Sequence, residues 1–133
     1  MIDDKALIDA FEAGDEPDGG FHHREHVRVA WYYLQQAPFT EALVRFSHNL
    51  RRFAAARGKP GLYHETITTA YLLLINERLD GDDRNLSWTA FAERHADLLT
   101  WKPSALDRYY RPETLLSDRA RRTFVMPDRL AGE

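Results

Sequence analysis

Apolar residues recur along most of this chain at intervals of three and four positions, the spacing that places side chains on one face of an α-helix. The pattern predicts five helices, over about residues 4–13, 22–35, 40–57, 62–79 and 87–98. No stretch shows the sustained alternation of apolar and polar residues that is typical of a half-buried strand. The sequence therefore predicts an all-α fold.

Residues that favour helix ends support several of these boundaries. Asp3 or Asp4 is expected to cap the first helix, which ends near Gly14. Thr40 is expected to cap the third helix and Ser87 the fifth, because their short hydroxyl side chains can accept a hydrogen bond from a first-turn N–H group. These signals give the expected helices defined starts and ends.

The chain after Leu98 is more broken, and we expect short helical pieces there that pack across the bundle as a strap. The apolar residues of this strap are Leu106, Tyr109, Tyr110, Leu115, Leu116, Phe124 and Val125. The fold class expected for residues 1–133 is thus one all-α domain, an irregular bundle of four to five helices with a C-terminal strap of short helical segments.

Length and composition fit one globular domain, since 133 residues with 44% hydrophobic and 29% charged residues are enough to bury a single core. The chain has no Cys, hence no disulfide framework or thiolate metal site, and its start lacks the basic and then apolar character of a signal peptide. The longest apolar run, residues 70–75, is far shorter than the roughly 20 residues of a membrane span. We expect a cytoplasmic protein that does not cross a membrane.

Charge is unevenly distributed. Residues 1–20 hold seven acidic residues against Lys5, whereas the whole chain has a net charge of −3. The arginines between residues 108 and 122 alternate with acidic residues, a pattern that is typical of a solvated face and not of a phosphate-binding track. Nucleic-acid binding is therefore not expected.

Two histidine clusters are expected to meet in space. His23 and His26 lie in the first turn of the second expected helix, and His64 and Glu65 lie in the first turn of the fourth. Short connections make successive helices antiparallel, so the second and fourth helices should run parallel with their N-termini at the same end of the bundle. We expect a His-lined pocket at that end.

The helical wheel assigns different directions to the histidines of the second helix. At about 100° per residue, His23 points within roughly 20° of the apolar stripe, whereas His26 falls to the side, on the same flank as Tyr33. His22 points outward. His23 and His26 are therefore the pocket candidates.

Three interpretations of the cluster stay open. A divalent metal such as Zn or Fe could be held by three histidines or by two histidines and Glu65, although successive residues 64 and 65 point about 100° apart on a helix. A small polar or anionic molecule could be bound instead, with histidine as a donor or general base. In the third interpretation the histidines are hydrogen-bonded core residues.

The residues that carry these interpretations fall into two sets. The candidate catalytic and metal-binding residues are His23, His26 and His64, and the candidate ligand-binding residues are Tyr33, Glu65, Thr68 and Tyr71.

Two blocks of the sequence resemble a known group. Phe21, His23, His26 and Val27 with the following apolar stripe, and then residues 63–68, are similar to the two blocks of a group of small, largely uncharacterised bacterial helical proteins. The resemblance implies that His23, His26 and His64 belong to the group's pattern, whereas His22 stands where the group more often has a small polar residue. It implies no activity.

The leading functional expectation is a small-molecule binding protein, catalytic if histidine acts as a base or metal ligand. No Gly-rich phosphate loop, nucleophile elbow or catalytic Cys is present in the sequence. The alternative is a non-enzymatic interaction module or homodimer with a structural His cluster. In that case a partner or second copy would dock on the aromatic residues expected to be exposed, Trp88, Trp101, Tyr109 and Tyr110.

Overall fold

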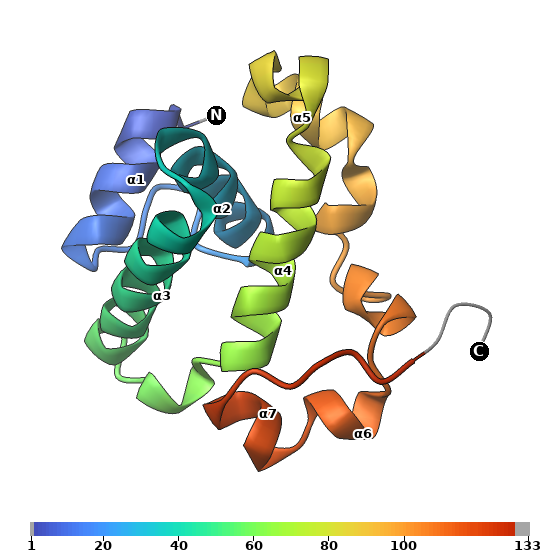
Figure 1. The fold of residues 1–133 in the computed structure, drawn as a ribbon. Helices are drawn as coiled ribbons and strands as arrows, with labels where there is room; N and C mark the ends of the chain where they lie inside the picture. The colour runs from blue at the N-terminus through green and yellow to red at the C-terminus, as the bar shows by residue number, and fades with distance from the viewer. Residues whose placement is uncertain (1, 130–133) are drawn as a thin grey trace.

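The computed structural model describes residues 2–129, which form helices and connecting loops and contain no strand. Figure 1 shows an irregular bundle followed by short helical pieces, so the predicted all-α fold with a C-terminal strap is confirmed. The α-helices are α1 Asp4–Ala13, α2 His23–Gln36, α3 Phe39–Ala56, α4 Glu65–Arg78, α5 Trp88–Arg94, α6 Pro112–Leu115 and α7 Asp118–Arg122. Four 3₁₀ turns lie at Pro60–Leu62, Gly81–Asn85, Ala96–Leu99 and Ala105–Arg108.

Helix α1 begins and ends where its sequence predicts. The Asp3 carboxylate accepts a hydrogen bond from the backbone N–H of Ala6 at 2.7 Å. Gly14 ends the helix in the left-handed region, at φ 77°, which a residue without a Cβ adopts without strain. Leu7 and Phe11 face inward and are buried against the bundle.

Helices α2, α3 and α4 form the centre of the bundle and reverse direction at each short connection. Figure 1 shows α3 running opposite to α2 and α4, so α2 and α4 run parallel with both N-termini at one end. The N-cap predicted for α3 is wrong: Pro38, in an extended conformation, precedes the helix, and Thr40 lies inside its first turn. Pro38 has no side-chain acceptor, so no side chain caps this helix, and the fixed φ of Pro38 with its extended ψ sets the start at Phe39.

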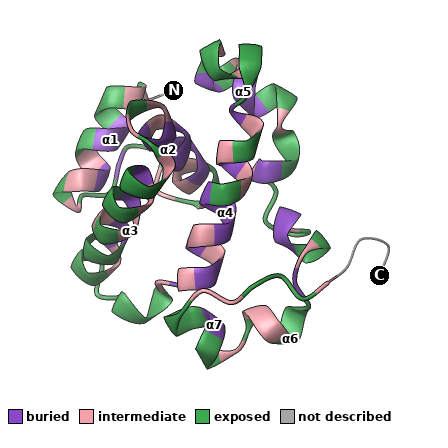
Figure 2. Ribbon diagram, viewed as in Figure 1, coloured by how far each residue is buried: buried purple, intermediate pink, exposed green. Residues whose placement is uncertain are grey.

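Helix α4 is the central element. Helices α2 and α3 contact it on one side, and α7 with the 3₁₀ turn at Ala105–Arg108 contacts it on the other. Buried residues therefore lie on more than one face of α4, among them Thr66, Leu72 and Ile75. Figure 2 shows this buried interior beside the mostly exposed outer surface of α3. The predicted helix start at Leu62 or Tyr63 is wrong, because a 3₁₀ turn precedes His64 and α4 begins at Glu65.

The C-terminal strap is fixed to α4 by hydrogen bonds. The Thr66 hydroxyl donates to the Thr123 carbonyl at 2.8 Å and accepts from the Val125 backbone N–H at 3.0 Å. The Tyr110 hydroxyl donates to the Val125 carbonyl at 2.7 Å. The last described residues are thus held across the end of the bundle. Leu116, which was expected to pack there, is 79% exposed.

Two of the four aromatic residues expected to be exposed are buried. Trp88 is 4% exposed and packs on Trp31 with ring centroids 5.5 Å apart, and Tyr110 is 1% exposed. Trp101 is 44% exposed and Tyr109 is partly buried. The expectation for both residues is wrong, because Trp88 packs against α2 and the Tyr110 hydroxyl reaches Val125 of the C-terminal strap. The four residues therefore do not form one exposed docking surface.

Within residues 2–129, no helix combines the length and the apolar character that crossing a membrane requires.

Replacement of Thr66 by Val should destabilise the protein, since the valine keeps the shape of the side chain but loses both hydrogen bonds to the strap. We expect a cost of about 1–3 kcal/mol in the free energy of unfolding, measured from urea midpoints. Thr69→Val on the same helix is the control, because the Thr69 hydroxyl makes no hydrogen bond within residues 2–129. Equal midpoints for the two variants would contradict the role given to Thr66.

Candidate functional site

A cavity of about 650 Å³ lies between α2, α3 and α4. Its volume is within the range of roughly 300–1,000 Å³ that is usual for small-molecule sites. Its apolar wall includes Val27 and Ala30 of α2, Phe46, Leu50, Phe53 and Ala54 of α3, and Ile67, Leu72 and Ile75 of α4. The polar side chains in the wall include His23, His26, His64 and Thr68, with Tyr71 beside them, and charged side chains and the exposed His22 also line the cavity.

The structure brings together most of the candidate site residues. His23, His26 and His64 line the one cavity, as do Thr68 and Tyr71, because the parallel helices α2 and α4 place their first turns at the same end of the bundle. Each histidine, however, has a different set of contacts.

Two predicted ligand-binding residues lie outside this cavity. The Tyr33 hydroxyl points toward α1 and α3, where it donates to a Glu12 carboxylate oxygen at 2.5 Å and accepts from the Asn49 amide at 3.0 Å. The Glu65 carboxylate accepts from the Tyr63 hydroxyl at 2.6 Å. The same carboxylate oxygen lies 3.4 Å from Arg51. These partners hold both side chains away from the cavity.

His64 is a structural residue with both ring nitrogens occupied. It is the N-cap of α4, and its Nδ1 accepts a hydrogen bond from the backbone N–H of Ile67 at 3.1 Å. Its Nε2 lies 2.7 Å from the Leu115 carbonyl oxygen and must donate, since a carbonyl can only accept. The contacts therefore define one neutral tautomer. Burial lowers the pKa of His64, against the smaller raising effect of the Leu115 carbonyl.

His23 is also fixed by a backbone carbonyl. Its Nε2 lies 2.8 Å from the Leu98 carbonyl oxygen and donates to it, which leaves Nδ1 as the unprotonated nitrogen of the neutral ring. The ring packs against Tyr71 and Trp101, with centroids 4.8 and 5.0 Å away. Burial lowers the pKa of His23, and the hydrogen bond to Leu98 partly opposes this.

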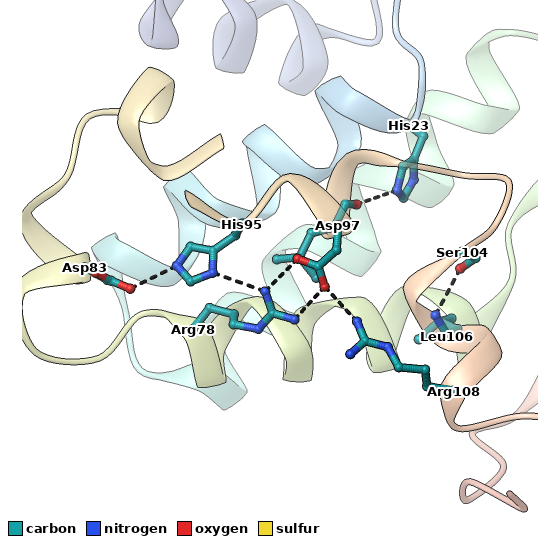
Figure 3. A network of polar contacts seen from close by, with 9 residues as sticks. His23, Arg78, Asp83, His95, Asp97, Ser104, Leu106 and Arg108 are labelled. Carbon is teal, nitrogen blue, oxygen red and sulfur yellow. Dashed lines mark hydrogen bonds and ion pairs between the residues drawn. The ribbon is translucent and has the colours of Figure 1, made fainter. Parts of the chain in front are cut away.

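The segment that carries Leu98 is held by a charged network (Figure 3). Arg78 donates two hydrogen bonds to the Asp97 carboxylate, at 2.9 and 2.8 Å, and Arg108 donates a third at 2.8 Å. Arg78 lowers the pKa of Asp97 to about 2. His95 joins the network, since its Nε2 donates to Asp83 at 2.9 Å and its Nδ1 accepts from Arg78 at 3.1 Å. The network fixes the carbonyl that orients His23.

His26 differs from the other two histidines of the cavity. Neither of its ring nitrogens makes a hydrogen bond to any group within residues 2–129, and the half-buried ring packs on Phe21 at a centroid distance of 4.5 Å. Burial lowers the pKa of His26 to about 4, with smaller contributions from His23 and His22. A neutral imidazole offers one donor and one acceptor, so His26 presents both to the cavity wall without a partner from the described chain.

The predicted metal set is not assembled in the part of the chain that the structure describes. No group of three or more His, Asp and Glu side chains there is placed to hold one ion. His64 uses both nitrogens in the cap and the strap contact, and Glu65 points out of the cavity. Within the described residues, His23, His26 and His64 therefore do not form a three-ligand site for Zn or Fe.

Comparison with protein-family models, with curated proteins and with solved structures finds no significant match to this chain. The resemblance to a group of bacterial helical proteins therefore stays a prediction. The cavity is the feature from which a function can be proposed.

Sequence reasoning missed the α3 wall and the charged end of the cavity. Phe46, Leu50 and Phe53 have the spacing of ordinary core residues, and nothing in that spacing shows that they face a hollow. Lys59 and Arg121 also line the cavity. Arg121 was expected on a solvated face because acidic residues alternate with the arginines around it.

Replacement of His64 by Ala should destabilise the protein by about 1–3 kcal/mol, because it removes a helix cap and leaves the Leu115 carbonyl without its donor. His64→Asn should recover part of this loss, since an Asn oxygen can cap α4. His48→Ala, on the exposed side of α3, should change stability by less than about 0.5 kcal/mol. Urea midpoints test the series, and a harmless His64→Ala would contradict the structural role.

Stability should fall as the pH drops from about 6.5 to about 4 because of His26. The pKa of His26 is about 4 in the folded protein and close to 6.5 in the unfolded chain, so the unfolded chain binds a proton first as the pH falls. This lowers the free energy of unfolding by up to about 3 kcal/mol. His26→Gln should remove this part of the pH dependence, whereas His48→Gln should leave it unchanged. Parallel curves of unfolding free energy against pH for the wild type and His26→Gln would contradict the assignment.

Proposed function

We propose that this protein binds a small, largely apolar molecule in the cavity between α2, α3 and α4, and that a hydrogen-bonding group of the molecule meets His26. The observation that carries the proposal is the unpartnered imidazole of His26 in a wall that is otherwise mostly apolar. A ligand with a donor or an acceptor group can supply the hydrogen-bond partner that the described chain does not give to this imidazole.

The shape and lining of the cavity support this proposal. Its wall is apolar on all three helices, with a few polar groups placed among the apolar side chains, which is the usual composition of small-molecule sites. Besides His26, the wall contains the buried Thr68. The Tyr71 hydroxyl, by contrast, is already engaged with the Ser104 hydroxyl at 2.7 Å.

Binding is better supported than proton transfer. A general base works best when its pKa lies near the working pH, and the pKa of about 4 makes His26 a weak base at neutral pH. His64 can accept a proton only by giving up the cap of α4. The histidines are therefore better suited to hold a ligand than to catalyse its conversion. The cytoplasmic location expected from the cysteine-free sequence stays part of this proposal.

An uncharged fluorescent probe such as N-phenyl-1-naphthylamine should bind the protein at one saturable site, with the blue-shifted emission of an apolar environment. Ala54→Phe should abolish this binding, because Ala54 lines the cavity and the phenyl group would fill it. Ala55→Phe is the matched control, since the neighbouring Ala55 is exposed and lies outside the cavity wall.

Urea midpoints for both alanine variants should show that they are folded before binding is compared. Failure of the wild type to bind the probe saturably, or equal binding by the two folded variants, would contradict the proposed function.

A further inference from the structure

The two ends of the cavity differ in polarity. One end is buried and apolar, lined by Val27, Ala30, Leu72 and Ile75, which are all nearly inaccessible to solvent. The exposed end is lined by Glu16, Arg57, Lys59, Leu62 and Arg121. A ligand that fills the cavity therefore has an apolar part in the interior and a part that meets solvent and charged side chains.

The charges at the exposed end do not cancel. Arg57 pairs with Glu16 at 3.7 Å, and Glu16 is the one carboxylate among the residues that line the cavity. Lys59 and Arg121 make no ion pair with any carboxylate within residues 2–129. The exposed end thus keeps two positive charges that the described chain does not neutralise.

The fold brings these two residues to one short turn. The Arg121 guanidinium donates to the Gly61 carbonyl at 2.7 Å, and Gly61 lies in the 3₁₀ turn that directly follows Lys59. Arg121 comes from α7 and Lys59 from the connection between α3 and α4, so the fold brings together cations that lie 62 positions apart in sequence. One of the Arg121 nitrogens is used in fixing the side chain, and the other donors of the guanidinium remain.

We propose that the ligand is an organic anion, with an apolar body among α2, α3 and α4 and a carboxylate or phosphate group at the exposed end facing Lys59 and Arg121. This inference rests on the proposed function and names its ligand class. Charge-assisted hydrogen bonds from the two cations select the anionic group, and the buried end selects a body without charge. A ligand with a positively charged head group is disfavoured, because Lys59 and Arg121 would repel that group.

Ligands that share one chain and differ in the head group test the inference. Decanoate, decyl phosphate and decanol should each be titrated against the bound uncharged probe. We expect decanoate or decyl phosphate to displace the probe about 2- to 30-fold more tightly than decanol, since two exposed ion pairs each strengthen binding modestly. The ratio of the two anions then identifies the head group, and the preference over decanol should shrink at about 1 M salt.

Charge-removing variants assign the preference to the two cations. In the protein with Lys59→Met and Arg121→Gln, decanoate and decyl phosphate should bind no more tightly than decanol binds to the same variant. Arg122→Gln is the matched control, because Arg122 is the next residue of α7 and does not line the cavity. It should keep the preference for the anion.

The outcomes separate this inference from the proposed function. Saturable probe binding with no preference for either anion over decanol would overturn the inference and leave the proposed function in place. An anion preference that survives in the double variant would also overturn it. No saturable binding of probe or of any decyl ligand would overturn both.

Discussion

The first turn of α4 joins the helical bundle to the C-terminal strap. This helix is enclosed by α2 and α3 on one side and by the C-terminal segment on the other, so the polar groups at its N-terminus need partners from the chain. His64 supplies a cap through Nδ1 and joins the Leu115 carbonyl through Nε2, and Thr66 holds the strap at Thr123 and Val125. The same contacts that begin the helix thus close the end of the bundle.

This arrangement divides the histidines by function. His64 is committed to the helix cap and His23 to the Leu98 carbonyl, which the Asp97 network holds in place. His26 alone among the three has no partner in the described chain, and burial keeps its ring neutral. The apolar wall from α3 lies beside that ring, so the cavity combines an apolar volume with a histidine that can donate or accept a hydrogen bond.

The helix order and the meeting of the histidine clusters followed from local pattern, because apolar periodicity defines each helix and short connections define its direction. The role of His64 depended on Leu115, 51 positions away, and no local signal reports such a contact. The helical wheel placed Tyr33 on the flank of α2. It could not identify Glu12 as the partner, because a wheel gives the direction of a side chain but not the residues that it contacts. Trp88 and Tyr110 were misjudged because their burial depends on contacts distant in sequence, with Trp31 for Trp88 and with Val125 for Tyr110.

The claim that His26 serves the cavity while His64 serves the fold is tested most directly by a nitrogen-detected NMR titration of the histidine rings, with and without the uncharged probe. His26 should stay neutral down to about pH 4 in the free protein, and its ring signals should shift when the probe binds. His64 should show a proton on Nε2, none on Nδ1, and no change on binding. A His26 ring that titrates near pH 6.5 and does not respond to the probe would contradict the account.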